Sequence, residues 1–127
     1  MIIRNENPNP YKFFDNFNQE VAVSTERYEI GGHVFEWDRG KNLSNIRKHG
    51  VTFKIAAKAF FDPCADVYED EEHSQAEERF ILIGMDEEER ILAVCHCYRG
   101  EGESITRIIS ARKATEYEED LYGGVIE

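Results

Sequence analysis

The sequence has no long apolar run and none of the common local signatures of cofactor-dependent enzymes. None of its apolar stretches approaches the roughly 18 residues that a membrane-spanning helix requires. The opening stretch MIIRNENPNPYKFF has no apolar segment after its first arginine, so we expect no secretory signal and no membrane partner. We find no P-loop, dinucleotide-binding fingerprint, nucleophile elbow or HExxH motif, and we therefore expect no cofactor.

Cysteine is also scarce, with one residue at Cys64 and two more at Cys95 and Cys97. The count is odd and the last two alternate within an apolar run, which favours buried thiols in a reducing compartment, the cytoplasm, over a disulfide framework. A metal site would need Cys95, His96 and Cys97 to converge. Adjacent side chains on a strand point to opposite faces, so we expect no metal ion there.

Basic residues are few relative to acidic ones. The 127 residues carry 15 lysines and arginines against 26 acidic side chains, for a net charge of −11. An acidic chain is repelled by phosphate, which argues against nucleic acid as a partner. The charge is uneven, however: residues 61–90 hold 12 acidic and 2 basic side chains, whereas residues 36–60 hold 6 basic and 2 acidic ones. A local basic surface can therefore still bind an anion.

The chain has the length of one domain, preceded by an irregular arm. Two of the three prolines and many asparagines lie within the first 20 residues. We divide the chain into residues 1–32, an arm with the first hairpin strand, and residues 33–127, a single α+β domain. Glycines at Gly31 and Gly32 separate two alternating stretches and predict a β-hairpin. Three aromatic residues of the arm could form a docking segment for a partner or for a second copy: Phe13, Phe14 and Phe17.

Two helices are predicted after the hairpin. Asp38 can cap a helix running through KNLSNIRKH, residues 41–49, that ends at Gly50, with Leu43 and Ile46 facing inward. Thr52 can cap a second helix, which the Asp62-Pro63 pair would end. The apolar stripe of this second helix consists of Phe53, Ala56, Ala57, Phe60 and Phe61.

The second half of the chain predicts an antiparallel sheet. Strands are expected over residues 79–85, 91–98 and 105–111, with a weaker one over residues 66–69, and the short connections favour antiparallel hairpins. The stretch TEYE at residues 115–118 is a capping box that begins a terminal helix. The predicted architecture is α+β, with two N-terminal helices, an antiparallel β-meander and a short C-terminal helix.

Alternation along these strands predicts a cluster of cations. If both hairpins are symmetric about their loops, Arg79, His96 and Arg107 become cross-strand neighbours on one face, although a slip of one residue would separate them. Two guanidinium groups beside an imidazole can hold a phosphate and move protons around it. The alternative is that nearby glutamates neutralise each arginine in exposed ion pairs. These are Glu78, Glu101 and Glu103.

Other candidate residues have structural alternatives. Lys48 and His49 end the first helix, where cations interact favourably with the helix dipole. Trp37 lies among apolar residues and is more typical of a core than of a base-stacking surface. Glu118 already belongs to the capping box, and Tyr122 lies four residues later on the same helical face.

Three blocks, in order, resemble the BrnT family of bacterial toxins. They are FEWDRGKNLSNIRKHGVTF, ERFILIG and ITRIISARKATEYEEDLY, and together they span about residues 33–122. The resemblance implies a RelE-like α+β fold and a metal-independent ribonuclease toxin of a type II toxin–antitoxin pair. It also implies a basic, DNA-binding, BrnA-like antitoxin, and operator DNA contacted only through the toxin–antitoxin complex.

The resemblance also assigns residues. It implies that arginines hold the scissile phosphate, and that RNA is cleaved by attack of a ribose 2′-OH. Proton exchange is expected from Glu118 or Tyr122, which match family positions, or from His96 of the predicted cation cluster. The arginines that match the blocks are Arg79, Arg107 and Arg112. Further RNA contacts are expected from Arg99 and from the basic end of the first helix, Arg47, Lys48 and His49.

Two other functions stay open at this stage. The acidic terminal helix EYEEDLY would repel the phosphates of RNA. The chain could therefore be an inactive toxin-fold protein that acts only by binding its antitoxin and regulating a promoter. It could also be a structural domain that dimerises through the aromatic arm.

Overall fold

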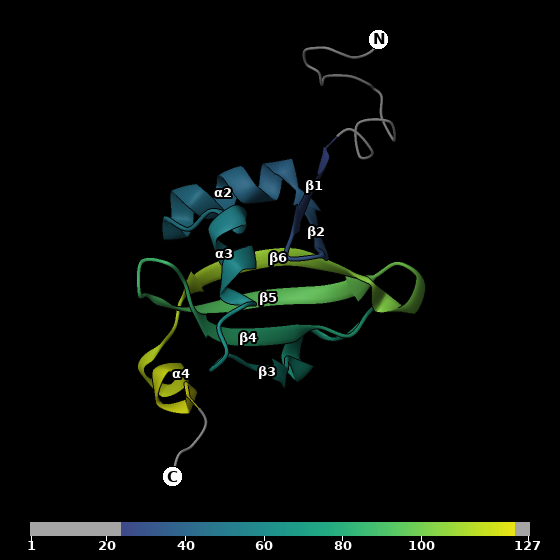
Figure 1. Ribbon diagram of the computed structural model, residues 1–127. Helices are drawn as coiled ribbons and strands as arrows, with labels where there is room; N and C mark the ends of the chain where they lie inside the picture. The colour runs from purple at the N-terminus through teal and green to yellow at the C-terminus, as the bar shows by residue number, and fades with distance from the viewer. Residues whose placement is uncertain (1–23, 124–127) are drawn as a thin grey trace.

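The computed structural model describes residues 24–123, so the arm with Phe13, Phe14 and Phe17 lies outside the described residues. The described chain begins with a hairpin of β1 (Thr25–Ile30) and β2 (His33–Asp38), which confirms the predicted turn (Figure 1). Gly31 and Gly32 have φ values of 59° and 76°, which side chains with a Cβ rarely adopt. The division between residues 32 and 33 remains a prediction.

Helix α2 (Arg39–His49) begins and ends where the sequence predicts. The Asp38 carboxylate accepts a hydrogen bond from the backbone of Lys41, and Gly50 ends the helix with φ 70°. The predicted inward residues are wrong, because Leu43 and Ile46 are 51% and 36% exposed. Asn45 faces the sheet instead.

The amide of Asn45 explains this orientation. Its Nδ2 donates to the carbonyls of Val51 and Ala111, and its Oδ1 accepts from the backbone N–H of Ala111. The helix therefore docks on strand β6 through a buried polar side chain, and its apolar residues turn outward. Helical periodicity could not reveal this, because apolar residues are assumed to mark the buried side.

Helix α3 (Phe53–Ala59) is capped by Thr52, as predicted, and supplies much of the core. Phe53, Ala56 and Ala57 are fully buried, whereas Phe61 lies beyond the end of the helix and is 47% exposed. Phe60, also beyond the helix, still packs against the core, so the predicted stripe is confirmed except at Phe61.

The remaining elements complete a six-stranded sheet. They are β3 (Asp66–Glu69), the 3₁₀ turn η1 (Glu71–His73), β4 (Phe80–Met85), β5 (Ile91–Arg99), the 3₁₀ turn η2 (Glu101–Glu103), β6 (Ile105–Lys113) and α4 (Glu116–Leu121). The sheet order is β1-β2-β6-β5-β4-β3. Both residues of the predicted capping box, Thr115 and Glu118, hold the start of α4.

Two features of the predicted architecture need correction. Strand β2 pairs with β6 in parallel, so the sheet is mixed and not purely antiparallel. The description of the two helices as N-terminal is also wrong, because they follow the first hairpin, in the order expected from the individual elements. They connect β2 to β3 at the opposite edge of the sheet, and the chain then returns through β4 and β5 to β6, which lies beside β2 (Figure 1).

The two faces of the sheet have different surroundings. Helices α2 and α3 cover one face, where the main core lies, whereas α4 contacts β4 (Figure 1). Trp37 is 3% exposed within this core, and its indole N–H donates to Glu26, which confirms its structural reading. The face opposite to α2 and α3 carries the candidate site. Among residues 24–123, no helix is both long and apolar enough to cross a membrane.

Candidate active site

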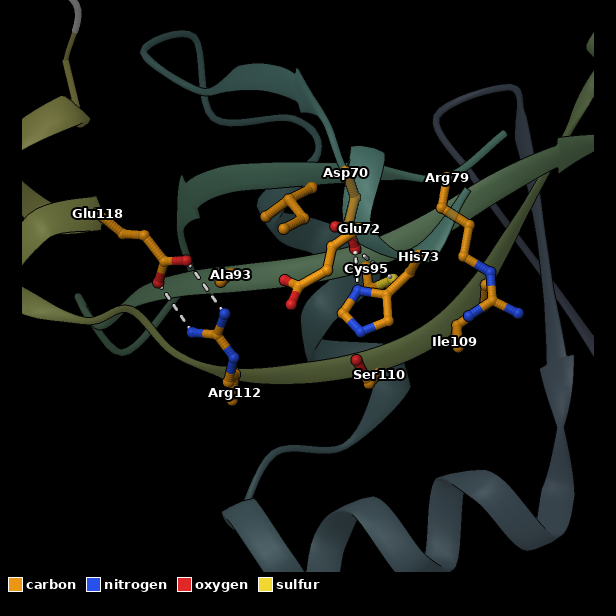
Figure 2. A pocket seen from close by; sticks show the side chains of 11 residues that line it. Asp70, Glu72, His73, Arg79, Ala93, Cys95, Ile109, Ser110, Arg112 and Glu118 are labelled. Atoms are coloured by element: carbon orange, nitrogen blue, oxygen red, sulfur yellow. Dashed lines mark hydrogen bonds and ion pairs between the residues drawn. The ribbon is translucent and has the colours of Figure 1, made fainter. Parts of the chain in front are cut away.

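A pocket of about 420 Å³ opens on the sheet face opposite to α2 and α3 (Figure 2). Its floor consists of side chains from the three strands β4, β5 and β6, and its rim of residues from the β3–β4 connection and from α4. The lining residues are Asp70, Glu72, His73, Arg79, Ile81, Ala93, Cys95, Ile109, Ser110, Arg112 and Glu118. Cations, carboxylates, an imidazole and a thiol therefore meet in one cavity.

Arg79 stands immediately before β4, where its backbone fixes the neighbouring turn. The Arg79 N–H donates to Ser74 Oγ at 2.8 Å, and the Arg79 carbonyl accepts from the N–H of Asp70 at 2.9 Å. Its guanidinium makes no ion pair or hydrogen bond within residues 24–123. An arginine that lines a pocket without a counter-ion is suited to bind an anion.

Arg112 and Glu118 form a forked ion pair at the other end of the pocket. Arg112 Nη1 and Nη2 donate to the two carboxylate oxygens at 2.8 and 3.0 Å. The hydrogen bonds from Arg112 lower the pKa of Glu118, and the carboxylate raises the pKa of Arg112. Glu118 also accepts from the Thr115 N–H in the capping box, so the helix cap fixes the orientation of Arg112.

His73 and Asp70 form a second polar pair in the pocket. His73 Nδ1 lies 2.9 Å from Asp70 Oδ2, and the histidine side chain is 60% exposed whereas that of Asp70 is 10% exposed. Nε2 of His73 has no hydrogen-bond partner in the described part of the chain. In Figure 2 the imidazole lies between Arg79 and Arg112. A carboxylate that orients an accessible imidazole is a common arrangement for proton transfer.

Comparison with known proteins now adds to this geometry. Residues 37–118 match the sequence profile of the family described as "Ribonuclease toxin, BrnT, of type II toxin-antitoxin system", which is more than half of the chain. The chain belongs to the BrnT family.

Among solved structures, the chain is similar to the Brucella abortus ribonuclease toxin BrnT, determined at 1.1 Å resolution. It is 28% identical in sequence, the alignment covers 63% of this chain and 94% of that chain, and the TM-score is 0.46. No curated protein sequence matches this chain. Membership of a type II toxin–antitoxin family implies an antitoxin partner.

In this BrnT-family chain, the predicted cluster of Arg79, His96 and Arg107 is wrong for its histidine. His96 is fully buried on the helix-covered face, between the rings of Phe60 and Phe80. Burial lowers the pKa of His96, which favours the neutral ring. Phe80 is the direct partner of His96 on β4, so Arg79, one residue earlier, faces the other side of the sheet.

Arg107 reaches the same face as the pocket because β6 is irregular. Ser110 pairs with Cys95 and Ile108 with His96, which leaves Ile109 without a partner, as in a β-bulge. The extra residue allows Arg107 and Arg112, five positions apart, to share a face. Arg107 does not line the pocket, and it donates to Glu36 at 2.8 Å.

The other predicted residues lie outside the pocket. Tyr122 donates to Asp62 at 2.7 Å, and burial together with this bond raises the pKa of Tyr122 to about 12. Its backbone is extended, so the predicted common helical face with Glu118 ends before it. Arg99 pairs with Glu77 at 3.1 Å. The last turn of α2 holds Arg47, Lys48 and His49, on the helix-covered side.

Sequence reasoning missed His73 and Asp70. They lie within the run EDEEHS, which reads as a solvated acidic loop. Their spacing could have indicated the pair, because side chains three residues apart can contact each other when the segment forms a helical turn. Neither residue belongs to a regular strand, so alternation could not place them on a face.

Proposed function

We propose that this BrnT-family protein is an endoribonuclease that cleaves RNA without a metal ion at the pocket. The observation that carries the proposal is the meeting of an arginine without a counter-ion, Arg79, with an imidazole held by a carboxylate, His73 on Asp70. One group binds phosphate and the other transfers protons. Family membership supplies the substrate class, since the family is one of ribonuclease toxins.

Arg79 and Arg112 are the proposed phosphate ligands. A guanidinium presents a planar fork of donors that matches two phosphate oxygens, and it stabilises the negative charge that develops as the phosphorus becomes five-coordinate. Arg79 is available without breaking an ion pair. Arg112 is held in place by Glu118, so we assign Glu118 a positioning role and not proton transfer.

The proposed reaction is a transesterification. The ribose 2′-oxygen attacks the adjacent phosphorus and loses its proton, the 2′-O–P bond forms, and the P–O5′ bond breaks. The products are a 2′,3′-cyclic phosphate and a 5′-hydroxyl, which takes up a proton. His73, with Nε2 free and Nδ1 fixed by Asp70, is the proposed proton-transfer group. His96 is buried and Tyr122 keeps its proton at neutral pH, so neither performs this step.

Two further arginines extend the basic surface beyond the pocket. We call the sheet face opposite to α2 and α3 the open face. On this face Arg107 of β6 pairs in register with Cys97 of β5, and Arg99 lies two residues beyond Cys97 on β5. Their partners, Glu36 and Glu77, can exchange for phosphates of a bound chain. We propose that single-stranded RNA crosses this surface, because unpaired bases leave the ribose and phosphate accessible.

The proposal includes the biological context of the family. The toxin would act in the cytoplasm, inhibit translation by RNA cleavage, and be neutralised by a basic, BrnA-like antitoxin that suits an acidic toxin. Operator DNA would be contacted only through the toxin–antitoxin complex. A RelE-like arrangement and a homodimer through the arm also remain predictions.

The test is cleavage of a fluorescently labelled single-stranded RNA in EDTA by purified, antitoxin-free protein. We expect the wild type to produce 2′,3′-cyclic phosphate ends, and we expect Arg79→Ala to lose about 10²–10³-fold in rate. Lys113→Ala is the matched control, because it removes one exposed cation next to Arg112 without touching the pocket. It should cleave within about twofold of the wild type.

If folded wild-type protein leaves RNA intact, or if Arg79→Ala cleaves as fast as Lys113→Ala, the enzymatic proposal fails. The first outcome would favour a toxin-fold protein that acts only by binding its antitoxin. Circular dichroism on each variant establishes that the fold is intact.

A further inference from the structure

The rim of the pocket contains donors that the proposed reaction leaves unused. One ligand atom from each of Asp70, Glu72 and His73 lies within 4.8 Å of the other two. Cys95 reaches the same place from strand β5, with its Sγ 4.0 Å from Asp70 Oδ2. Three donors thus come from one turn and a fourth from a different element. All four residues line the pocket, and in Figure 2 Cys95 lies behind the ring of His73.

We propose that Asp70, Glu72 and His73 bind a Zn²⁺ ion, with the Cys95 thiolate as the fourth donor. Zinc bonds of roughly 2.0–2.3 Å place tetrahedral ligand atoms about 3.3–3.7 Å apart. The His73 Nδ1 to Asp70 Oδ2 distance is 2.9 Å and the Cys95 Sγ to Asp70 Oδ2 distance is 4.0 Å. These two contacts reach tetrahedral spacing through shifts of about half an ångström. Cys95 stands outside the group whose ligand atoms all lie within 4.8 Å of one another, so its side chain must also move toward Glu72 and His73 when the ion binds.

The chemistry of the donors selects the metal. Imidazole nitrogen, thiolate sulfur and carboxylate oxygen together suit Zn²⁺, whereas Mg²⁺ and Ca²⁺ prefer oxygen ligands alone. Coordination through sulfur requires the thiolate, so the proton of Cys95 leaves to solvent when the ion binds.

The local electrostatics also favour a cation. The run from residue 69 to residue 72 contributes four acidic side chains, and the Asp70 side chain is 10% exposed. Among the lining residues only Arg79 and Arg112 oppose a positive ion, and the carboxylate of Glu118 compensates Arg112. The partial burial of Asp70 strengthens its attraction for a divalent ion.

Zinc in this position would inhibit the ribonuclease. The ion takes the Nδ1 atom that Asp70 now orients and occupies the space beside Arg79, so metal and RNA compete for the pocket. This consequence rests on the proposed function. The binding of zinc does not, and it is measurable on a protein that cleaves nothing.

The first experiment is a calorimetric titration of the full-length, antitoxin-free protein with zinc sulfate. We expect one ion per chain, at least about tenfold weaker binding by His73→Ala, and affinity within twofold of wild type for Glu71→Gln. Glu71 lies in the same acidic turn but outside the ligand group. Equal affinities of wild type and His73→Ala, with both proteins folded by circular dichroism, would overturn the site.

The second experiment tests the thiolate with Co²⁺ as a spectroscopic probe. Wild type should show a sulfur-to-cobalt charge-transfer band in the near ultraviolet that Cys95→Ser lacks and that Cys64→Ser, altered at an exposed cysteine, retains. A band unchanged in Cys95→Ser would remove Cys95 from the ligand set. RNA cleavage is then assayed with and without zinc, and full activity in zinc-saturated protein would refute the inhibition alone.

Discussion

At the scale of single residues, the three chemical groups of the site differ in how their charges are compensated. Arg79 makes no ion pair within residues 24–123, Arg112 is paired with Glu118, and His73 is held by Asp70. These differences suit phosphate transfer. Arg79 can bind the phosphate directly, Arg112 is already held in a fixed orientation, and His73 keeps one ring nitrogen accessible.

His73→Asn tests proton transfer at this scale. Asparagine keeps a polar side chain of similar reach but cannot exchange a proton near neutral pH, so we expect RNA cleavage to slow by about 10²–10⁴-fold. RNA affinity, measured by fluorescence anisotropy, should stay within a few-fold because the arginines remain. Glu71→Gln serves as the control in the same turn. Cleavage by His73→Asn at the wild-type rate would assign the proton transfer elsewhere.

At the scale of elements, the bulge in β6 and the docking of α2 decide the shape of the open face. The unpaired Ile109 brings Arg107 to the same side as Arg112, and Asn45 ties α2 to the backbone of the same strand at Ala111. The strand that carries both arginines is therefore fixed from its opposite face by one buried amide.

Asn45→Ala is expected to destabilise the fold. It removes three buried hydrogen bonds and leaves backbone groups of Val51 and Ala111 without partners, which should lower the free energy of unfolding by roughly 2–4 kcal/mol. Urea denaturation measures the change. Ser44→Ala, on the same helix and without a hydrogen bond among the described side chains, should stay within about 0.5 kcal/mol. Equal stability of the two variants would show that the amide does not hold the helix.

At the scale of the whole molecule, a net charge of −11 coexists with a site that binds phosphate in the proposal. The acidic runs repel RNA at long range, and the arginines act only at short range. In the proposal, the same overall charge attracts the basic antitoxin. We therefore expect acidity to limit the affinity for RNA more than the affinity for the antitoxin.

The acid stability of the fold should depend on the Arg112–Glu118 pair. The pKa of Glu118 in the folded protein lies below its ordinary value of 4.5, so the ion pair stabilises the fold at neutral pH. This contribution is lost as the pH falls below 4.5 and through the pKa of Glu118 in the folded protein. Between pH 7 and pH 3, the melting temperature of wild type should fall a few degrees further than that of Glu118→Gln. The exposed Glu119→Gln should follow wild type. Parallel curves for all three would show that the ion pair adds no stability.

The sequence by itself determined the elements. Helix caps at Asp38, Thr52 and Thr115, the Gly31-Gly32 turn and the period of the strands are local signals, because each depends on residues a few positions apart. The residue blocks also indicated the BrnT family, which the profile match confirmed.

Only the tertiary structure decided which side chains meet. The register between β4 and β5 buried His96, the bulge at Ile109 turned Arg107 to the open face, and the parallel pairing of β2 with β6 made the sheet mixed. The Arg79 backbone accepts a hydrogen bond from the Asp70 N–H and donates one to Ser74 Oγ, and these bonds hold the turn that places His73 at the pocket. Each of these depends on contacts between distant segments, and a shift of one residue in such a contact reverses the face of every side chain on a strand.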